Sequence, residues 1–538
     1  MRRRSRSRLS AAVRDRAAAA ASRSPRAAAR PQAAAGASRS PRAAARDRAA
    51  AGASRSPRAV PAAPDHPPPS DLVVALAPGV RVLAGGRVLV GGTPVRVLRL
   101  TDAGAAAVRG WRSGGPVGPS PGRRTLARRL LDAGLLSPRP APVAPGGSLA
   151  IVVPVRDRPG ELARCLRALC ASCPGSPLVV VDDGSADAAA IRAVCAERGA
   201  ASIRHDAPRG PGAARNRGLA ACDAPFVAFV DSDVVASGAW AATLLGHLAD
   251  PCIGAVAPRI LALAPASGAI ARYEARHSAL DMGPAGGLVA PGRPVPYVPS
   301  TVLGVRRAAM GAFDEALHVG EDVDLVWRLV RGGWRVRYEP AATVRHDHRL
   351  RLGEFASRRR QYAGSIGLLA RRHPDALPAA RLGPWMAAPW ALALAGRPAP
   401  AAVAVAADIV LLARRLGATA GGGDGRIAGR LAAVLVARGL IGTGFGLAHA
   451  VRRAWAPALL LAARRRGARR LLVAAYAVPL VQDALAGRRL PRPADVALRL
   501  LDEAIALAGT WEGCVRHRTA RPLLPAWRPA GRRGTIAA

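Results

Sequence analysis

Two aspartates, Asp231 and Asp233, come directly after the short apolar run 226–230. A run this short, rich in aromatic and β-branched residues, is typical of a strand buried on both faces. In open α/β sheets, ligands bind beyond the carboxyl ends of the strands. Two carboxylates at such an end can share one divalent cation with the phosphate oxygens of a ligand, which is how proteins usually hold Mg²⁺. The alternative is that the aspartates only cap a helix, since Asp is a good N-cap residue.

Further candidate residues lie at similar places along the chain. Asp182 and Asp183 end another apolar run, Glu321 and Asp322 stand where a helix is expected to begin, and His346 follows the last expected strand. A carboxylate within hydrogen-bond reach of a hydroxyl can act as its general base, and Asp322 is the best candidate. The alternatives are a charged helix N-terminus favoured by the helix dipole for Asp322, and a buried structural histidine for His346.

Alternating strands and helices must position these residues. The expected strands are 149–153, 178–181, 202–205 and 226–230, and the expected helices between them are 161–170, 188–199 and 213–221. Strands that alternate with helices predict a mainly parallel sheet with right-handed crossovers. Because the polar residues follow the strands, the sequence predicts a ligand site at the carboxyl edge of this sheet.

Composition excludes several kinds of chemistry. All 79 basic residues are Arg, so neither a Walker A lysine nor a Schiff-base lysine is possible. The formal net charge of +44 suggests a nucleic-acid-binding protein, but aromatic residues make up only 4% of the chain, and we expect no specific nucleic-acid partner. The seven cysteines follow no recognisable signal peptide, which favours a reduced compartment and ordinary thiols.

The sequence divides into four regions. Residues 1–70 repeat Ala, Arg and Pro and are expected to be disordered, either as a basic tail or as sequence upstream of the true start. Residues 71–145 alternate like short strands around glycine pairs and then show two helical segments, which predicts a small α+β module, weakly similar to peptide-binding winged-helix modules. Residues 146–382 form the α/β domain. Residues 383–538 are expected to be helical and membrane-associated.

The membrane prediction depends on three apolar segments. They span 400–413, 431–450 and 471–481, and clusters of Arg flank them. The second is about long enough to span a bilayer, and the other two are short. The alternative is that amphipathic helices lie on a bilayer or on the enzyme body. In either membrane arrangement, the expected location is the cytoplasmic face of the cell membrane.

The order of the acidic pairs resembles the GT-A fold of family 2 glycosyltransferases over residues 148–349. The resemblance implies a Rossmann-like, mainly parallel α/β catalytic domain, here with the small N-terminal module and C-terminal hydrophobic helices. It also implies a nucleotide-sugar donor. The donor-binding residues that it implies lie on the uridine side (Pro154, Asp157), at the base and ribose (Asp182, Asp183) and near the diphosphate (Arg215, Asn216).

The same resemblance assigns the metal and the base. It implies that Asp231 and Asp233 bind Mn²⁺ or Mg²⁺, with His346 adding a metal or diphosphate contact. It also implies that Asp322, paired with Glu321, is the catalytic base of an inverting transfer. Asp324 follows on the same turn and is expected to point elsewhere.

Four longer segments resemble one particular family among these glycosyltransferases. Residues 270–283, 297–307, 319–329 and 337–349 are similar to the membrane-associated glycosyltransferase family of mycofactocin biosynthesis. That similarity implies transfer of β-1,4-linked glucose from a UDP-sugar to a peptide-derived redox cofactor precursor. The alternative within glycosyl transfer is a lipid-linked or cell-envelope acceptor. The Ala/Gly/Arg stretch 414–430 departs from the family and leaves the topology of the C-terminal helices open.

Overall fold

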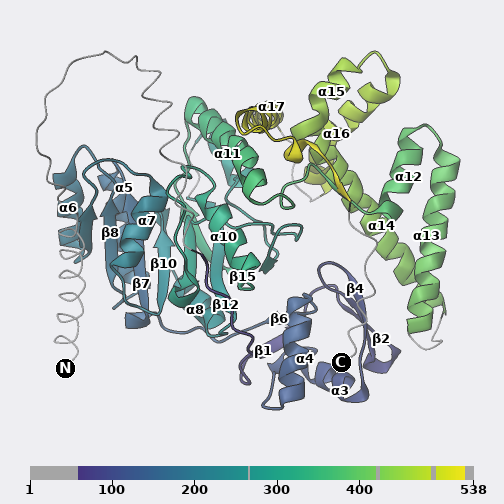
Figure 1. Ribbon diagram of the computed structural model, residues 1–538, viewed down its shortest axis with the longest axis horizontal. Coiled ribbons are helices and arrows are strands. Elements are labelled where there is room, and N and C mark those ends of the chain that lie inside the picture. Colours follow the sequence, from purple (N-terminus) through teal and green to yellow (C-terminus); the bar gives the residue numbers. More distant parts are fainter. Residues whose placement is uncertain (1–58, 264–266, 420–424, 486–491, 528–538) are drawn as a thin grey trace, which may run out of the picture.

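The computed structural model describes residues 59–263, 267–419, 425–485 and 492–527. A nine-stranded sheet forms its centre (Figure 1). The four predicted strands run parallel in the order β10-β7-β8-β9. Their bounds are β7 Leu149–Val155, β8 Leu178–Asp182, β9 Ala201–Arg204 and β10 Phe226–Val230. Because they point the same way, the polar residues after β8 and β10 lie at one edge of the sheet.

The other half of the sheet is mixed. β14 runs antiparallel between β10 and β12, and β12 pairs in parallel with β15. The remaining strands are β11 Val234–Val235, β12 Ile253–Ala262, β13 Gly287–Val289, β14 Val302–Arg306 and β15 Arg335–His346. β15 is long, because it pairs with β12 on both sides of an irregularity in register, and it includes His346, which was predicted to follow the strand. This mainly parallel sheet is the predicted GT-A form.

Helices cover both faces of the sheet. One buried core lies between the sheet and α5, α6 and α8, and a second lies between the sheet and α7 and α10. The bounds are α5 Pro159–Ser172, α6 Ala188–Glu197, α7 Pro211–Ala220, α8 Trp240–Leu248, α10 Glu321–Arg331 and α11 Leu352–Arg372. α5 and α7 start before the predicted residues because each begins with a proline, whose fixed φ suits the first helical turn.

The N-terminal module contains two small sheets and two helices. β1 Val73–Leu76 pairs with β5 Gly115–Pro116 and β6 Leu136–Pro138, and β3 Val88–Gly91 pairs with β2 Arg81–Leu83 and β4 Arg96–Arg99. The helices are α3 Asp102–Trp111 and α4 Pro121–Asp132. Trp111 is fully buried in the core between them. The module therefore has a hydrophobic core of its own, as the α+β pattern predicted.

The predicted boundary at residue 70 needs a correction. Residues 1–58 lie outside the described part of the chain, but 59–70 pack against the folded body. The Trp334 indole N–H donates to the carbonyl of Pro61 at 2.7 Å, and the N–H of Ala63 donates to the carbonyl of Gly332 at 2.9 Å. Val60 and Ala63 also contact the second core. The low apolar content of this segment predicted disorder. Its polar contacts are made by the backbone rather than by side chains, and amino-acid composition does not reveal them.

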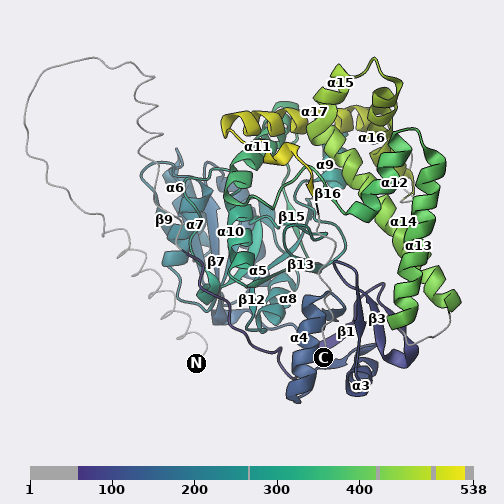
Figure 2. The ribbon, with the colours of Figure 1, turned by 45° about the vertical axis from the view of Figure 1, so that its right-hand side comes forward.

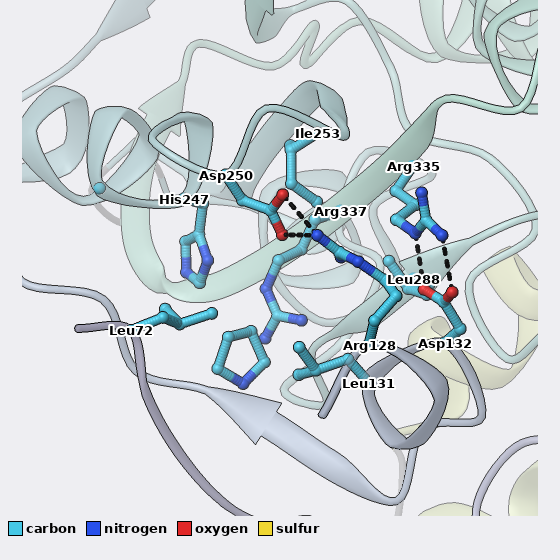
Figure 3. Close-up of a pocket in the computed structure, with 12 residues that line it drawn as sticks. Leu72, Arg128, Leu131, Asp132, His247, Asp250, Ile253, Leu288, Arg335 and Arg337 are labelled. Atoms are coloured by element: carbon cyan, nitrogen blue, oxygen red, sulfur yellow. Dashed lines mark hydrogen bonds and ion pairs between the residues drawn. The ribbon is translucent and has the colours of Figure 1, made fainter. Parts of the chain in front are cut away.

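Ion pairs join the N-terminal module to the α/β domain around a small cavity (Figure 3). Arg128 on α4 binds both carboxylate oxygens of Asp250, at 2.7 and 2.8 Å, and both side chains are buried. Arg128 uses one nitrogen for both oxygens, whereas Arg335 on β15 binds Asp132 through two nitrogens, one on each carboxylate oxygen, at 2.6 and 2.7 Å. Paired hydrogen bonds of this kind fix orientation as well as distance, so the two units are held in one arrangement.

The C-terminal region is helical, as predicted. Its helices are α12 Pro384–Leu394, α13 Pro398–Thr419, α14 Gly425–Ala450, α15 Ala456–Leu461, α16 Arg466–Leu485 and α17 Pro493–Arg516, with a π-helical turn at Val451–Trp455. In the part of the chain that the structure describes, one helical run, Gly425–Leu461, is long and apolar enough to cross a membrane. Length and composition alone do not show that it does so.

The last helix of the C-terminal region, α17, packs on the α/β domain. It lies against α11, as Figures 1 and 2 both show. The helices approach closely because glycines face each other: a Cβ on Gly513 would lie 2.3 Å from the carbonyl oxygen of Gly364, and one on Gly367 would lie 2.1 Å from that of Gly513. The predicted C-terminal region is therefore partly built into the catalytic domain.

Candidate active site

The aspartates after β10 lie beside His346, and the strand pairing explains why. β11 pairs antiparallel with the end of β15, with Val234 opposite His346. This pairing brings His346 Nε2 to 3.3 Å from the Asp233 carboxylate. Arg158, at the start of α5, contacts the other oxygen of Asp233. The structure therefore brings together two of the three predicted metal ligands, with an arginine against them.

The third predicted ligand, Asp231, faces a different partner. Its carboxylate accepts a hydrogen bond from Arg215 at 2.7 Å. Among the described residues, no group of three or more His, Cys, Asp or Glu side chains is arranged to hold a metal ion. The donor set nevertheless fits Mn²⁺ or Mg²⁺, because these ions take carboxylate ligands and complete their shell with water and substrate phosphates. Asp231 and Asp233 supply carboxylates of this kind, and the imidazole of His346 lies 3.3 Å from the carboxylate of Asp233.

Arg215 connects the end of β10 to the start of α10. Its guanidinium is buried and binds Asp231 through one nitrogen and Glu321 through another, at 2.7 and 2.8 Å. It also lies over the ring of Phe313, 5.5 Å from the centroid. Although burial by itself lowers the pKa of Arg215, the two carboxylates raise it, so the side chain stays charged. Arg215, which was predicted to lie near a diphosphate, is therefore already paired with two carboxylates.

The predicted base lies on the first turn of α10. Gly320 precedes the helix with φ +85°, a conformation that L side chains rarely adopt. The Asp322 carboxylate accepts hydrogen bonds from the backbone N–H groups of Ser300 at 3.1 Å and Val323 at 2.8 Å. Burial raises the pKa of Asp322, and the charge of Arg215 opposes the rise. Such a carboxylate holds a proton more readily than an exposed one, as a general base must.

The two acidic residues beside Asp322, Glu321 and Asp324, bind different partners. Burial and the charge of Asp322 raise the pKa of Glu321, whose side chain holds Arg215. Asp324 points elsewhere, as predicted, and binds His373 at 2.9 Å and Arg328 at 2.7 Å in the protein interior. Asp324 is therefore part of the packing between α10 and the end of α11.

The aspartates at the end of β8, Asp182 and Asp183, mainly order the loops around them. Asp183 accepts hydrogen bonds from His205 and from the backbone N–H groups of Arg209 and Gly210, at 2.8 to 2.9 Å. Although burial raises the pKa of Asp183, these bonds lower it overall. Asp182 accepts a bond from the N–H of Ser185 and pairs with Arg204. Both carboxylates are thus fixed at the edge where a ligand would bind.

Two predicted donor residues lie close to these aspartates. Pro154, in β7, stands opposite Val181 of β8. Asp157 follows β7 with φ +55° and accepts a hydrogen bond from the N–H of Ala186 at 2.8 Å, while its own N–H donates to Ser185 Oγ at 2.9 Å. The left-handed conformation is unusual for a residue other than glycine, although Asp tolerates it better than most. These bonds tie the loop after β7 to the loop after β8.

Asn216 binds the loop that precedes α10. Its side-chain amide donates to the carbonyl of Phe313 at 2.9 Å and accepts from the N–H of the same residue at 2.8 Å. It also donates to Glu315 at 3.0 Å. The amide therefore holds the loop that leads to α10, and it supports the site through that loop.

Sequence reasoning missed three residues that shape the site. Arg158 contacts Asp233, Arg204 contacts Asp182, and His348 stacks edge-on against the ring of His346 at 4.8 Å between ring centroids. The arginines were hidden because Arg is common throughout this chain. His348 could have been found from its spacing, since residues i and i+2 at a strand end can lie together.

Comparison with known proteins supports the assignment from geometry. The family model described as "Glycosyl transferase family 2" matches residues 150–308, which run from the second residue of β7 to just past β14 and include both aspartates after β10. The chain is 39% identical over 478 residues to the "Pre-mycofactocin glycosyltransferase" of two Mycobacterium tuberculosis strains, CDC 1551 / Oshkosh and H37Rv. The alignment covers 85% of this chain and 98% of that protein.

Solved structures of lower similarity were also found. A Pyrobaculum calidifontis mannosyltransferase in complex with GDP-Man and Mn²⁺ is 17% identical, with a TM-score of 0.38, over 72% of this chain and 92% of that one. GalNAc-T7 with UDP, GalNAc and Mn²⁺ is 15% identical, with a TM-score of 0.31, over 38% of this chain and 43% of that one.

The GT-A sheet, the acidic pairs at its edge and the family match define a glycosyltransferase of family 2. The relatives narrow this class to one biosynthetic role. The chain belongs to the pre-mycofactocin glycosyltransferase family, whose members act in mycofactocin biosynthesis.

Proposed function

We propose that the protein transfers glucose from UDP-glucose, with inversion and in β-1,4 linkage, to pre-mycofactocin. The observation that carries the proposal is the double contact of Arg215 with Asp231 and Glu321, at 2.7 and 2.8 Å. This contact joins Asp231, a candidate metal ligand after β10, to Glu321, the residue that precedes the candidate base Asp322 in α10. The acceptor follows from the name of the relatives, and the sugar and linkage follow from the motif resemblance.

The reaction needs two groups on opposite sides of the sugar. The acceptor oxygen forms a bond to the anomeric carbon, the bond from that carbon to the diphosphate breaks, and UDP leaves with the electron pair. The acceptor proton passes to the carboxylate of Asp322, which two backbone N–H groups hold in place. A positioned base of this kind contributes about 10²- to 10⁴-fold to the rate.

The diphosphate side requires positive charge. Asp231, Asp233 and His346 would hold Mn²⁺ or Mg²⁺, and the ion would act as a Lewis acid that stabilises the leaving diphosphate. Arg158 contacts Asp233 in this structure and would add positive charge beside the ion. Asp157, Asp182 and Asp183 order loops that would face the nucleoside of the donor.

We further propose that the enzyme works at the cytoplasmic face of the cell membrane. The C-terminal helices support this, since many of their large apolar side chains are exposed, among them Val403, Leu461 and Val473. A membrane location would also suit the alternative acceptor, a lipid-linked or cell-envelope sugar. The two acceptors must therefore be compared directly.

The test is transfer by the full-length protein from radiolabelled UDP-glucose to pre-mycofactocin or to a lipid-linked acceptor, with Mn²⁺, with Mg²⁺ or with a chelator. We expect glucosylated pre-mycofactocin only when metal is present. Asp233→Ala should lower the rate at least about 100-fold, because it removes the carboxylate that joins His346 to the site. The exposed Asp375, changed to Ala, serves as the control.

Two results would contradict the proposal in different ways. Transfer only to the lipid-linked acceptor would show that the assignment of the acceptor is wrong. Full activity of Asp233→Ala in chelator, with Asp375→Ala behaving alike, would show that the aspartates after β10 do not hold a catalytic metal.

A further inference from the structure

The two ends of the long apolar helix α14 contact two different parts of the folded body. Near its start, Ala428 and Ala432 are buried against Val88 and Val90 of the N-terminal module. Figure 2 shows the lower ends of α13 and α14 beside the sheet that contains β3. The first turns of α14 are therefore fixed to the N-terminal module.

The far end of α14 is fixed to the catalytic domain. Ala450 is buried with Ala380 and Leu382, which follow α11. In the next turn, Arg452 and Arg453 bind Glu503 of α17 at 3.2 and 2.8 Å. α17 itself packs on α11 through glycine contacts. This end is thus held by buried apolar and ionic contacts together.

The N-terminal module and the catalytic domain are themselves joined by the ion pairs Arg128–Asp250 and Arg335–Asp132. A helix that crosses a bilayer has its two ends in the water on opposite sides. Here both ends touch one continuous protein body, which cannot lie on both sides at once. We propose that α14 does not cross the membrane but lies along its surface, as an in-plane anchor.

The exposed face of α14 has the composition that such an anchor needs. Ile427, Val434 and Ile441 recur every seven residues and are 47 to 54% exposed. Arg430 and Arg438 are exposed between them. Apolar side chains mixed with arginine on one face are typical of helices that lie at the boundary between head groups and acyl chains.

Charge identifies the partner as a bilayer with anionic lipids. Residues 425–461 contain several arginines and neither Asp nor Glu. Exposed arginines at 464–466 follow the exposed Leu460 and Leu461 of α15. A second copy of this chain is a poor partner, because the net charge of +44 makes two copies repel each other. An anionic head-group layer offers both the negative charge and the apolar interior.

The inference rests on the proposed membrane location, and the experiment separates the two. Full-length protein is mixed with vesicles of phosphatidylcholine, with or without phosphatidylglycerol, and floated on a gradient. We expect binding only to the anionic vesicles and its loss in high salt. The double variant R430Q/R438Q should bind roughly tenfold or more weakly. The matched control is R167Q/R192Q, two exposed arginines on α5 and α6.

The orientation is tested in intact cells that express the protein. Gly429 and Gly446 lie near the two ends of α14, and a side chain at either position meets open space. Each is changed to Cys in a Cys170→Ala background, since Cys170 is the exposed cysteine among those described. A membrane-impermeant maleimide should label both positions only after lysis, and alkaline carbonate should release the protein from membranes.

The possible failures are distinct. Labelling of one position in intact cells, with resistance to carbonate, would overturn the in-plane arrangement and leave the membrane location intact. Protein that stays soluble and floats with neither kind of vesicle would overturn both. Equal binding by R430Q/R438Q and its control would show that the face we assign is not the one that meets the lipid.

Discussion

Arginine and aspartate side chains define the site at the scale of single residues. Arg215 binds Asp231 and Glu321, Arg158 binds Asp233, and each of these pairs is at least partly buried. Charges this close and this shielded interact more strongly than exposed ones. The arginines therefore hold the carboxylates in place before any ligand binds.

The first prediction concerns Asp322. Changing it to Asn keeps the side-chain shape and one of the two backbone hydrogen bonds, since Ser300 and Val323 donate to different carboxylate oxygens, but it removes the ability to accept a proton. Single-turnover transfer should fall about 10²- to 10⁴-fold, while UDP-glucose binding, measured by calorimetry, should stay within a few-fold of wild type.

The neighbouring Asp324 distinguishes a catalytic loss from a structural one. Because Asp324 is buried against His373 and Arg328, Asp324→Asn should lower the melting temperature more than Asp322→Asn does. Asp375→Asn, on an exposed loop, should change neither property. Normal single-turnover transfer by Asp322→Asn, or loss of donor binding instead of transfer, would place the base elsewhere.

The acidic residues of the site could be predicted from the sequence more readily than the residues that bind them. Acidic residues at strand ends can be recognised because each apolar run has a clear end, as at Val230. The partners could not be predicted, because pairing depends on where loops return in space. Asn216 shows the difference, since it lies next to Arg215 in sequence but binds the loop at Phe313.

At the scale of elements, the packing of α17 on α11 is the least expected feature. The apolar pattern of the C-terminal region predicted helices, but it could not show that α17 returns to the catalytic domain. Three side chains of α17, Asp495, Arg499 and Asp502, contact α9 Ala269–His277 at a spacing that places them on one helix face. α17 therefore supports α9 as well as α11.

This contact gives a prediction for Gly513. A Cβ there would lie 2.3 Å from the carbonyl oxygen of Gly364, so Gly513→Ala must push the two helices apart. We expect a loss of about 1–3 kcal/mol in stability, seen as a lower melting temperature in scanning fluorimetry.

Gly446 provides the matched control within the same region. It lies in α14, and an added Cβ would meet nothing within 4 Å. Gly446→Ala should be neutral or should stabilise the protein by up to about 1 kcal/mol, because Ala favours helices. If both alanine variants melt like wild type, the close approach of α11 and α17 does not hold the C-terminal region in place.

At the scale of the whole molecule, the strand and helix order of the catalytic domain could be predicted, whereas the arrangement of the four regions could not. Alternating strands and helices are local signals, as at β7 and α5. The docking of the N-terminal module depends on ion pairs between residues more than a hundred positions apart, such as Arg128 and Asp250. Such pairs cannot be recognised in a sequence in which arginine is common throughout.

The last prediction concerns this docking. Arg128 and Asp250 are both buried and bind each other through two hydrogen bonds, at 2.7 and 2.8 Å. Removing Arg128 leaves the Asp250 carboxylate buried without its cation, which typically costs about 3–5 kcal/mol. In scanning calorimetry, Arg128→Ala should split off a separate, earlier transition for the N-terminal module, and limited proteolysis should release that module first. Arg112→Ala, at an exposed position of the same module, should leave the profile unchanged.

The double variant R128A/D250A decides whether the pair itself is responsible: it should recover part of the loss, since no charge is then left unpaired at that position. Strictly additive losses would mean that the apolar contacts and the backbone bonds of residues 59–70, rather than this ion pair, hold the module to the catalytic domain.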